Sequence, residues 1–511
     1  MDKKRVLINL VSNILSFIIQ LGINFIVTPI IVLKVGDAAY GFVGLANNFV
    51  SYANIFTIVI NSMASRFITV EYVKDKKDEA NKYYSSVFFM NIIMSILIFV
   101  VTTIFIMNID VLLNVPQELL GDVKITFVLS FINLILSLFN TIFNVAAFVS
   151  NRIDLSAIRN IAGNLIKTIL LILMFVLFRA RIYYIVLSTI IMSLFLIISN
   201  YRLSKKLCPD LVIKKEFFEF KYVKVLAKSG IWNSINSLSK TLLTGLDLLM
   251  ANLFVGPVGM GILSIAKTIP TAIENLLATF SNTFNPQFVL LYSKGNKEEL
   301  IHTVNYSLKI IGLIMLVPLA GIIAFGIPFF HLWLPAKSDQ EIINIQILSI
   351  LSILPFIISA SNYTLFVLDS VTNKLKRPVI ATFIMSLLST VTTIILLKIT
   401  DWGVFAIAGV SSMYWIIKVF FFNTINAAIN LNIKWYTFFR PFLKNLLCFS
   451  LVLVFYVLIN NMIAIYSYFD FILYVGIFGI IGYIFCFLFL LSKNEKDKFL
   501  KKLKSIYNRK T

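Results

Sequence analysis

Long apolar runs separated by short polar connections dominate this chain. Each run holds about 20 to 30 residues, the length that an α-helix needs to cross a bilayer, whereas a barrel strand needs only about 10 residues of alternating polarity. The runs lie at 6–33, 41–65, 83–107, 122–149, 157–178, 182–200, 226–252, 258–285, 303–333, 341–369, 379–398, 402–428, 441–461 and 468–492. This pattern predicts an all-α integral membrane protein with fourteen transmembrane helices.

The composition agrees with that pattern and excludes several classes of protein. Of the 511 residues, 59% are apolar and 14% are charged, whereas a soluble chain is about half apolar and a quarter charged. A soluble enzyme, a disordered chain and a disulfide scaffold are therefore excluded. The three cysteines and two histidines have no metal-binding or disulfide spacing, so we expect no metal and no cofactor.

The formal net charge of +21 indicates orientation in the membrane rather than nucleic-acid binding, because cytoplasmic loops collect lysine and arginine. With the N-terminus inside, six basic residues fall in outer connections: Lys34, Lys124, Arg179, Arg181, Lys337 and Lys398. Five more lie within spans, and the remaining 34 of 45 lie in inner loops and tails. We therefore expect a multi-pass protein of the inner (cytoplasmic) membrane with both termini in the cytoplasm, although Arg179 and Arg181 run against the rule.

The sequence contains an internal repeat with a shift of 220 residues. The segment VGDAAYGFVGLANNF from Val35 aligns without a gap with VGPVGMGILSIAKTI from Val255, and the match continues for about 70 residues. Identical residues in the first copy are Val35, Gly36, Gly41, Ala46, Tyr72, Lys74, Lys77 and Glu79. Six spans separate the copies, so both enter the membrane in the same direction. This predicts parallel halves related by an axis along the membrane normal, with a substrate site between them near the midplane.

The repeat and the linkers divide the chain into five expected parts. These are an N-lobe at 1–200, a cytoplasmic linker at 201–225, a C-lobe at 226–428, two further spans at 429–492 and a basic tail at 493–511. The linker has the lysines and aromatic residues of an interfacial stretch. The apolar tail residues Phe499, Leu500, Leu503, Ile506 and Tyr507 fall at helical spacing, which is typical of an amphipathic helix on an anionic leaflet. A plain solvated tail is the alternative.

Polar side chains form stripes along the first two spans of each half. Span 1 has Asn9, Asn13, Ser16, Gln20 and Asn24; span 2 has Asn47, Ser51, Asn54, Asn61 and Ser65. Span 7 has Ser229, Asn233, Asn236, Lys240 and Thr244; span 8 has Lys267, Thr271, Glu274, Ser281 and Asn285. A weaker stripe on span 4 has Asn133, Ser137, Asn140 and Asn144. Steps of three and four residues place each stripe on one helical face.

Two interpretations of these stripes remain open. Hydrogen bonds between helices, worth about 0.6 to 2 kcal/mol each, would account for one or two asparagines. Four equivalent stripes favour a wet cavity between the halves, and a lining of amides and hydroxyls suits a substrate rich in hydroxyl groups, such as a glycan. The candidate cavity residues are Gln20, Asn24, Asn47, Asn54 and Asn236.

Four charges fall within the spans of the second half, namely Lys240, Asp247, Lys267 and Glu274. Charges at the bilayer centre are costly, and their default interpretation is functional. Helical rise places Asp247 near the level of Lys267 and Lys240 near that of Glu274, so both pairs can neutralise each other. Alternatively, the lysines bind an anionic group such as a diphosphate, and the carboxylates couple transport to protons or sodium. Arg66 would meet the anion at the cytoplasmic mouth, unless it is an ordinary positive-inside anchor.

Three features resemble the polysaccharide or oligosaccharide flippases (Wzx-like) of the multidrug/oligosaccharidyl-lipid/polysaccharide exporter superfamily. They are the twelve-plus-two layout, the segment VGDAAYGFVGLANNF, and GLDLLMANLFVGPVGMGILSIAKTIP from Gly245 to Pro270. The resemblance implies two pseudo-twofold six-helix lobes in a V plus two C-terminal helices. It also implies a transporter, not an enzyme, that moves an undecaprenyl-diphosphate-linked oligosaccharide (an O-antigen, capsule or exopolysaccharide repeat unit) from the inner to the outer leaflet by alternating access.

The resemblance also bears on partners and on related branches. It implies contact with membrane lipids and with glycan polymerases and glycosyltransferases of the same pathway. Related flippases of peptidoglycan precursors line their cavity with basic residues of spans 1, 2 and 8. Here only Arg66 in span 2 and Lys267 in span 8 fit that pattern, which disfavours that branch.

Two other functions stay open. A cation-coupled drug exporter of the same superfamily should have a more aromatic and less amide-rich cavity. A membrane glycan polymerase or glycosyltransferase usually needs a large outer loop with catalytic residues, and the longest outer connection here is 108–121.

Overall fold

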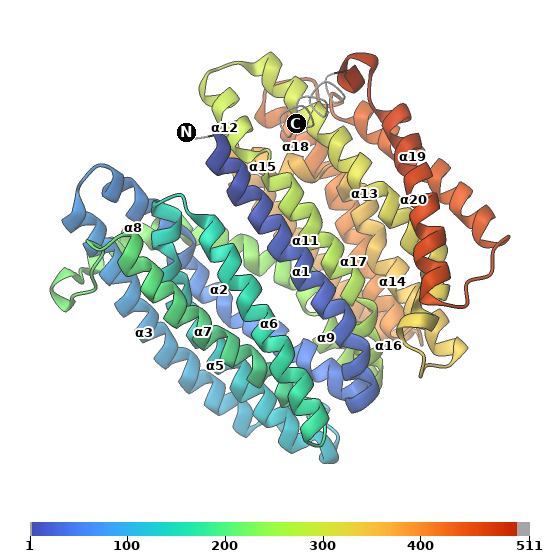
Figure 1. The fold of residues 1–511 in the computed structure, drawn as a ribbon, viewed down its shortest axis with the longest axis horizontal. Coiled ribbons are helices and arrows are strands. Elements are labelled where there is room, and N and C mark those ends of the chain that lie inside the picture. The colour runs from blue at the N-terminus through green and yellow to red at the C-terminus, as the bar shows by residue number, and fades with distance from the viewer. Residues whose placement is uncertain (1–2, 498–511) are drawn as a thin grey trace. The chain divides into compact units, whose positions relative to one another are not determined.

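The computed structural model describes residues 3–497, and the regular secondary structure of this part of the chain is entirely helical, with no strand. Figure 1 shows the helices in chain order. Their bounds are α1 Lys3–Val35, α2 Asp37–Val73, α3 Lys77–Met107, α4 Ile109–Leu112, η1 Gln117–Leu119, α5 Leu120–Val149, α6 Ile153–Leu177, α7 Tyr183–Leu207, η2 Lys215–Phe217, α8 Phe220–Lys240, η3 Thr241–Gly245, α9 Asp247–Met250, η4 Ala251–Val255, α10 Pro257–Ala266, α11 Thr268–Asn282, α12 Asn285–Ser293, α13 Lys297–Trp333, α14 Asp339–Ala360, α15 Tyr363–Val371, α16 Lys376–Ile399, α17 Val404–Ile417, η5 Lys418–Asn423, α18 Thr424–Asn430, α19 Phe439–Asn460 and α20 Tyr468–Leu490.

Thirteen helices in the described part of the chain are long and apolar enough to cross a membrane. They coincide with thirteen of the fourteen expected spans, so the all-α membrane architecture is confirmed. The expected tail helix at 493–511 is described only as far as residue 497, and its apolar positions from Phe499 to Tyr507 lie outside the described residues.

The eighth expected span, at 258–285, is not one helix. It divides at Lys267 into α10 and α11. The break has a local cause, because Pro270 has no N–H to donate to the carbonyl of Ala266 and its ring crowds that carbonyl. The hydrophobic run predicted the length of this segment correctly but did not predict that Lys267 would stand at a helix end.

The backbone supports the internal repeat. Gly36 has φ 82° and its equivalent Gly256 has φ 107°. Asp75, at the α2–α3 turn, has φ 59°, and its equivalent Gly295 has φ 68°. Positive φ is rare outside glycine, asparagine and aspartate, so its recurrence at the same 220-residue shift indicates that both copies fold through the same turns.

The chain groups into two compact units. The first comprises Met1–Ile265 with Thr382–Ile407, and the second comprises Ala266–Ala381 with Ala408–Thr511. In the first unit α5 packs along α7, α2 along α8 and α1 along α6; Figure 1 shows α3, α5 and α7 side by side. In the second unit α13 packs against α14, α19 and α20. The expected lobe boundaries at 200 and 226 follow from the repeat and stay a prediction.

Most of the expected linker at 201–225 has a fixed place in the first unit. Helix α7 continues to Leu207 and α8 begins at Phe220. Between them the Asn81 side chain on α3 donates to the Asp210 carbonyl at 3.0 Å and accepts from the Val212 N–H at 3.0 Å. Ser86, also on α3, exchanges hydrogen bonds with the backbone of Glu219 at 3.2 Å. The part of the linker between α7 and α8, called the strap below, is therefore held along α3 by hydrogen bonds.

Candidate functional site

The candidate site begins with an accessible polar face on α2. Asn47, Ser51 and Arg66 are exposed and Asn54 is half-buried. Their spacing places them on one side of the helix. The Asn54 Oδ1 accepts from the Thr57 hydroxyl at 2.6 Å, which fixes the amide while its NH2 group keeps donor capacity.

Helix α8 carries a second accessible polar face. Asn236 and Lys240, one turn apart, are both exposed. One turn before Asn236, the Asn233 amide donates to the Ser62 hydroxyl of α2 at 3.2 Å. This hydrogen bond joins the polar faces of α2 and α8 into one surface within the first unit.

Close backbone packing holds these two faces in place. A methyl group added to Gly230 of α8 would overlap the carbonyl of Val59 in α2. One turn along, the Ser234 hydroxyl donates to the Ile55 carbonyl at 2.5 Å. The two helices therefore touch along their small residues, and the amide and lysine side chains lie beside that contact.

A carbonyl in span 7 adds contacts that the stripe pattern missed. Span 7 widens into a π-helical turn at Thr241–Gly245, immediately after Lys240. The Gly245 carbonyl accepts from the Asn48 amide at 2.9 Å and from the Tyr52 hydroxyl at 2.6 Å. Asn48 and Tyr52 are spaced i and i+4 on α2, a spacing that is visible in the sequence, but only the fold reveals their partner. π-Helical turns often occur at functional sites.

The remaining predicted residues lie on α1 and α11. Gln20 is exposed on α1, and Asn24 lies one turn further along the same helix. Lys267 is half-buried at the break before α11, and Glu274 is half-buried within α11. Both α11 residues belong to the second unit.

Asp247 has a different environment from the other expected charges. It opens the short helix α9 and is only 2% exposed. Lys240 and Asp247 belong to the first unit, whereas Lys267 and Glu274 belong to the second. The expected pairs of Lys267 with Asp247 and of Lys240 with Glu274 each join one unit to the other, and they stay predictions.

The weaker stripe on span 4 forms hydrogen bonds between helices. Its three amides accept hydrogen bonds from neighbouring spans, Asn133 from Ser193 at 2.6 Å, Asn140 from Asn200 at 2.9 Å and Asn144 from Ser156 at 2.5 Å. Asn61 of span 2 likewise exchanges amide hydrogen bonds with Asn91, at 2.9 and 3.1 Å. These side chains join helices, as amides in membrane bundles commonly do.

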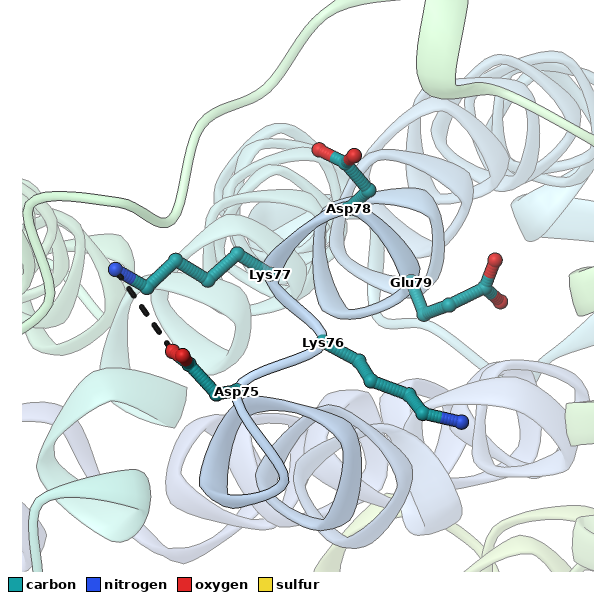
Figure 2. A pocket seen from close by; sticks show the side chains of 5 residues that line it. All are labelled: Asp75, Lys76, Lys77, Asp78 and Glu79. Carbon is teal, nitrogen blue, oxygen red and sulfur yellow. Dashed lines mark ion pairs between the residues drawn. The ribbon is translucent and has the colours of Figure 1, made fainter.

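The α2–α3 turn forms a charged hollow at the surface. Figure 2 shows its lining, which runs from Asp75 to Glu79, with Lys77 Nζ 4.0 Å from Asp75 Oδ1. Lys77 also pairs with Asp210 of the strap at 2.9 Å. Both signs of charge occur and neutralise each other, so the hollow has no preference for an anion. Nor do three His, Cys, Asp or Glu side chains gather as a metal site would require anywhere among residues 3–497.

Comparison with known proteins finds relatives of this chain. The family model described as polysaccharide biosynthesis protein matches residues 6–292, which is more than half of the chain. The chain is 26% identical over 411 residues to the uncharacterized membrane protein EpsK of Bacillus subtilis (strain 168), covering 80% of this chain and 81% of that protein.

Three solved structures share the fold. An inward-facing multidrug resistance MATE family transporter matches with a TM-score of 0.65 and 15% identity over 84% of this chain and 98% of the other. The lipid II flippase MurJ in an inward closed conformation matches with a TM-score of 0.63 and 15% identity, over 93% of this chain and 97% of the other. A MOP superfamily transporter from Pyrococcus furiosus matches with a TM-score of 0.62 and 16% identity, over 83% of this chain and 95% of the other. The all-helical membrane fold expected from the sequence is therefore confirmed, and it is the fold of these three proteins.

Proposed function

This chain belongs to the polysaccharide biosynthesis protein family, and on that premise we propose that it is a flippase for a lipid-linked oligosaccharide. The substrate would be an O-antigen, capsule or exopolysaccharide repeat unit on undecaprenyl diphosphate. The protein would move it from the inner to the outer leaflet of the cytoplasmic membrane by alternating access. Polymerases and glycosyltransferases of the same pathway would act after and before it.

One observation carries this proposal, namely the exposed amide and lysine face that α2 and α8 form together. Asn47 and Asn236 are exposed on helices long enough to cross a membrane. Polar groups in hydrocarbon need partners, so such a face favours a water-filled space. Side-chain amides both donate and accept hydrogen bonds, which suits the hydroxyl groups of a sugar.

Lysine and arginine side chains suit the lipid carrier's diphosphate. We propose that Lys240 and Lys267 bind it inside the membrane and that Arg66 receives it at the cytoplasmic mouth. Asp247 and Glu274 would couple the movement to protons or sodium. A lysine ammonium is a compact charge that serves phosphate groups well.

The movement itself would use the irregular parts of spans 7 and 8. The π-turn at Thr241–Gly245 directly follows Lys240, and the break in span 8 lies at Lys267. Each irregular part therefore lies next to a lysine that we propose to bind the diphosphate. A helix interrupted at such a point bends with little loss of hydrogen bonding. Substrate binding at Lys240 or Lys267 would therefore bias the local helix geometry.

Deletion of the gene tests the proposal. We expect the deletion strain to lose the surface glycan and to accumulate the undecaprenyl-diphosphate-linked oligosaccharide, measured by mass spectrometry of extracted lipids. Full-length protein should restore export. Normal surface glycan together with increased drug sensitivity would contradict the flippase and favour a drug exporter.

A further inference from the structure

Helix α6 carries a further polar stripe, separate from those on the first two spans of each half. Ser156, Asn160, Asn164 and Lys167 are spaced by four, four and three residues. The opposite side of the same helix exposes Ile158, Leu165, Ile169, Leu173 and Val176. An apolar side exposed in this way faces lipid, so the polar stripe faces the interior of the first unit.

Lys167 lies near the middle of the membrane on this inward face. It is ten residues from Leu177, where α6 ends, which corresponds to about 15 Å at the helical rise. Leu171 and Phe175, the next two residues on the packed side, share a hydrophobic cluster with Val27 and Ile31 of α1. Spans 1 and 5 run in the same direction, so this match places Lys167 at the level between Gln20 and Asn24.

The helices around Lys167 offer no free carboxylate. Helices α1 and α7 contain no Asp or Glu, and α5 and α6 contain one each. Asp122 of α5 pairs with Arg181 at 3.0 Å, and Asp154 of α6 pairs with Arg152 at 3.1 Å. Among the described residues, Lys167 makes neither an ion pair nor a hydrogen bond.

Arg159 adds a second cation to α6. It uses one N–H to bind the Leu155 carbonyl of its own helix at 2.8 Å. Its Nε is buried without a hydrogen-bond partner, and the described part of the chain provides no carboxylate for it. Eight residues separate Arg159 from Lys167, about 12 Å along the helix.

We propose that Lys167 is an anion site inside the first unit and that it takes the diphosphate of a polyprenyl-linked substrate, with Arg159 as the station nearer the cytoplasm. The assignment rests on the proposed function for the identity of its substrate. A cation in the membrane interior needs a partner, and none of the neighbouring helices supplies one. The exposed side chain of Asn160, between the two cations, gives the anion a polar neighbour as it passes.

Binding to purified full-length protein tests the site, with farnesyl diphosphate as the probe. We expect farnesyl diphosphate to bind and farnesol, which lacks the charge, not to bind. Removing a hydrogen bond to a charged group in Lys167→Gln should weaken binding about tenfold or more, whereas Lys167→Arg should retain it. Lys34→Gln, which removes an exposed lysine of the same unit, is the matched control. Equal binding by Lys167→Gln and wild type would overturn the site.

Two further measurements separate ligand binding from structural support. If Lys167 has no protein counter-ion, Lys167→Met should raise the melting temperature of the ligand-free protein and abolish the stabilisation that farnesyl diphosphate gives. A lowered melting temperature in Lys167→Met would identify a structural ion pair and contradict the proposal. If the protein binds inorganic pyrophosphate but does not bind farnesyl diphosphate, the anion does not come from a lipid carrier, and that part of the proposal is overturned.

The deletion strain keeps this inference distinct from the flippase proposal. Normal glycan export after gene deletion, with probe binding still dependent on Lys167, would overturn the flippase and leave the anion site standing. Lost export after deletion, with normal export and normal probe binding by Lys167→Gln, would leave the flippase standing and overturn the site.

Discussion

At the scale of single residues, the position of a charge matters less than the partners around it. Lys309 of α13 has a carboxylate partner, Glu495, at 2.8 and 3.0 Å, and this pair fixes the segment that follows α20. Lys167 has no such partner among the described residues. Both residues are lysines within spans, but only Lys309 has a carboxylate partner. We therefore expect Lys309 to have a structural role and Lys167 to bind an anion.

Neutralising the proposed diphosphate ligands should reduce export. A hydrogen bond to a charged group contributes about 1.5–3 kcal/mol, so Lys240→Gln or Lys267→Gln should lower glycan export about ten- to hundredfold. Protein level in the membrane should not change. Export is measured as surface glycan, and Lys398→Gln at an exposed position is the control. Unchanged export with both lysines replaced would remove them from the site.

Glu495 should make stability depend on pH. Burial alone would raise the pKa of Glu495, but Lys309 and the N–H and hydroxyl of Ser492 lower the pKa below its ordinary value of 4.5. A lowered folded-state pKa gives stability that is present above pH 4.5 and is lost as the pH falls through the folded value. Glu495→Gln should therefore lower the melting temperature at pH 7.

The acid range provides the check on that prediction. The difference between wild type and Glu495→Gln should shrink as the pH falls below about 4.5 and vanish below the folded-state pKa, where the carboxyl is neutral in both states of the wild type. Asp497→Asn, which changes an exposed carboxylate two residues away, should match wild type at every pH. A difference that persists at low pH would mean that Glu495 acts through packing alone.

At the scale of elements, small residues decide which helices touch. Gly230 brings α8 onto the backbone of α2, and Gly41 brings α2 onto α10, where an added methyl group would lie 2.9 Å from the Gly261 Cα. Polar side chains then take the positions beside these contacts. The amide and lysine face exists because glycine holds the backbones close.

Filling one of these contacts should weaken the first unit. Gly230→Ala places a methyl group against the Val59 carbonyl, and overpacking of this kind costs about 1–3 kcal/mol. The melting temperature in detergent should fall. Gly321→Ala is the control, since no heavy atom lies within 4 Å of the added methyl group, and it should be neutral or stabilising. Equal melting temperatures for both variants would contradict the close α2–α8 contact.

At the scale of the whole molecule, the repeat appears as contacts between equivalent residues. Gly41 touches Gly261, and Gly44 touches Ser264; each pair is 220 residues apart. Equivalent residues can meet only where a pseudo-twofold axis passes between them. Within the first unit, the crossing of α2 and α10 therefore has the local twofold symmetry that the sequence repeat implies.

Cross-linking this crossing tests whether it must open during transport. The Cβ added at Gly44 would lie 3.7 Å from the Ser264 Cβ, which matches disulfide geometry. With Cys208, Cys448 and Cys486 replaced by serine, Gly44→Cys with Ser264→Cys should form a disulfide and stop glycan export. Reduction should restore export, and each single cysteine should export normally. Full export by the cross-linked protein would show that the crossing stays closed.

The orientation of the whole chain follows from its basic residues. Cytoplasmic loops retain lysine and arginine, and 34 of the 45 fall on one expected side. A reporter fused after Thr511 should therefore be active in the cytoplasm. Activity only in the outer compartment would reverse the predicted topology and the proposed direction of transport.

The sequence by itself determined the membrane architecture, the repeat and the family. Hydrophobic run length is a local property, because every backbone group in hydrocarbon must be bonded within its own helix. Turn glycines such as Gly36 and Gly256 are equally local, since positive φ is rare outside glycine, asparagine and aspartate. These features could be predicted without knowing which helices touch.

Only the tertiary structure decided what each polar side chain does. Asn54 and Asn140 belong to similar stripes, yet Asn140 accepts a hydrogen bond from Asn200, whereas among the described residues Asn54 bonds only within its own helix. Lys167 became a candidate site only when the neighbouring helices proved to hold no free carboxylate. Whether a polar side chain has a hydrogen-bond partner or a counter-charge depends on residues that are distant in the chain but close in space. The pattern of residues along the sequence does not show which distant residues come close.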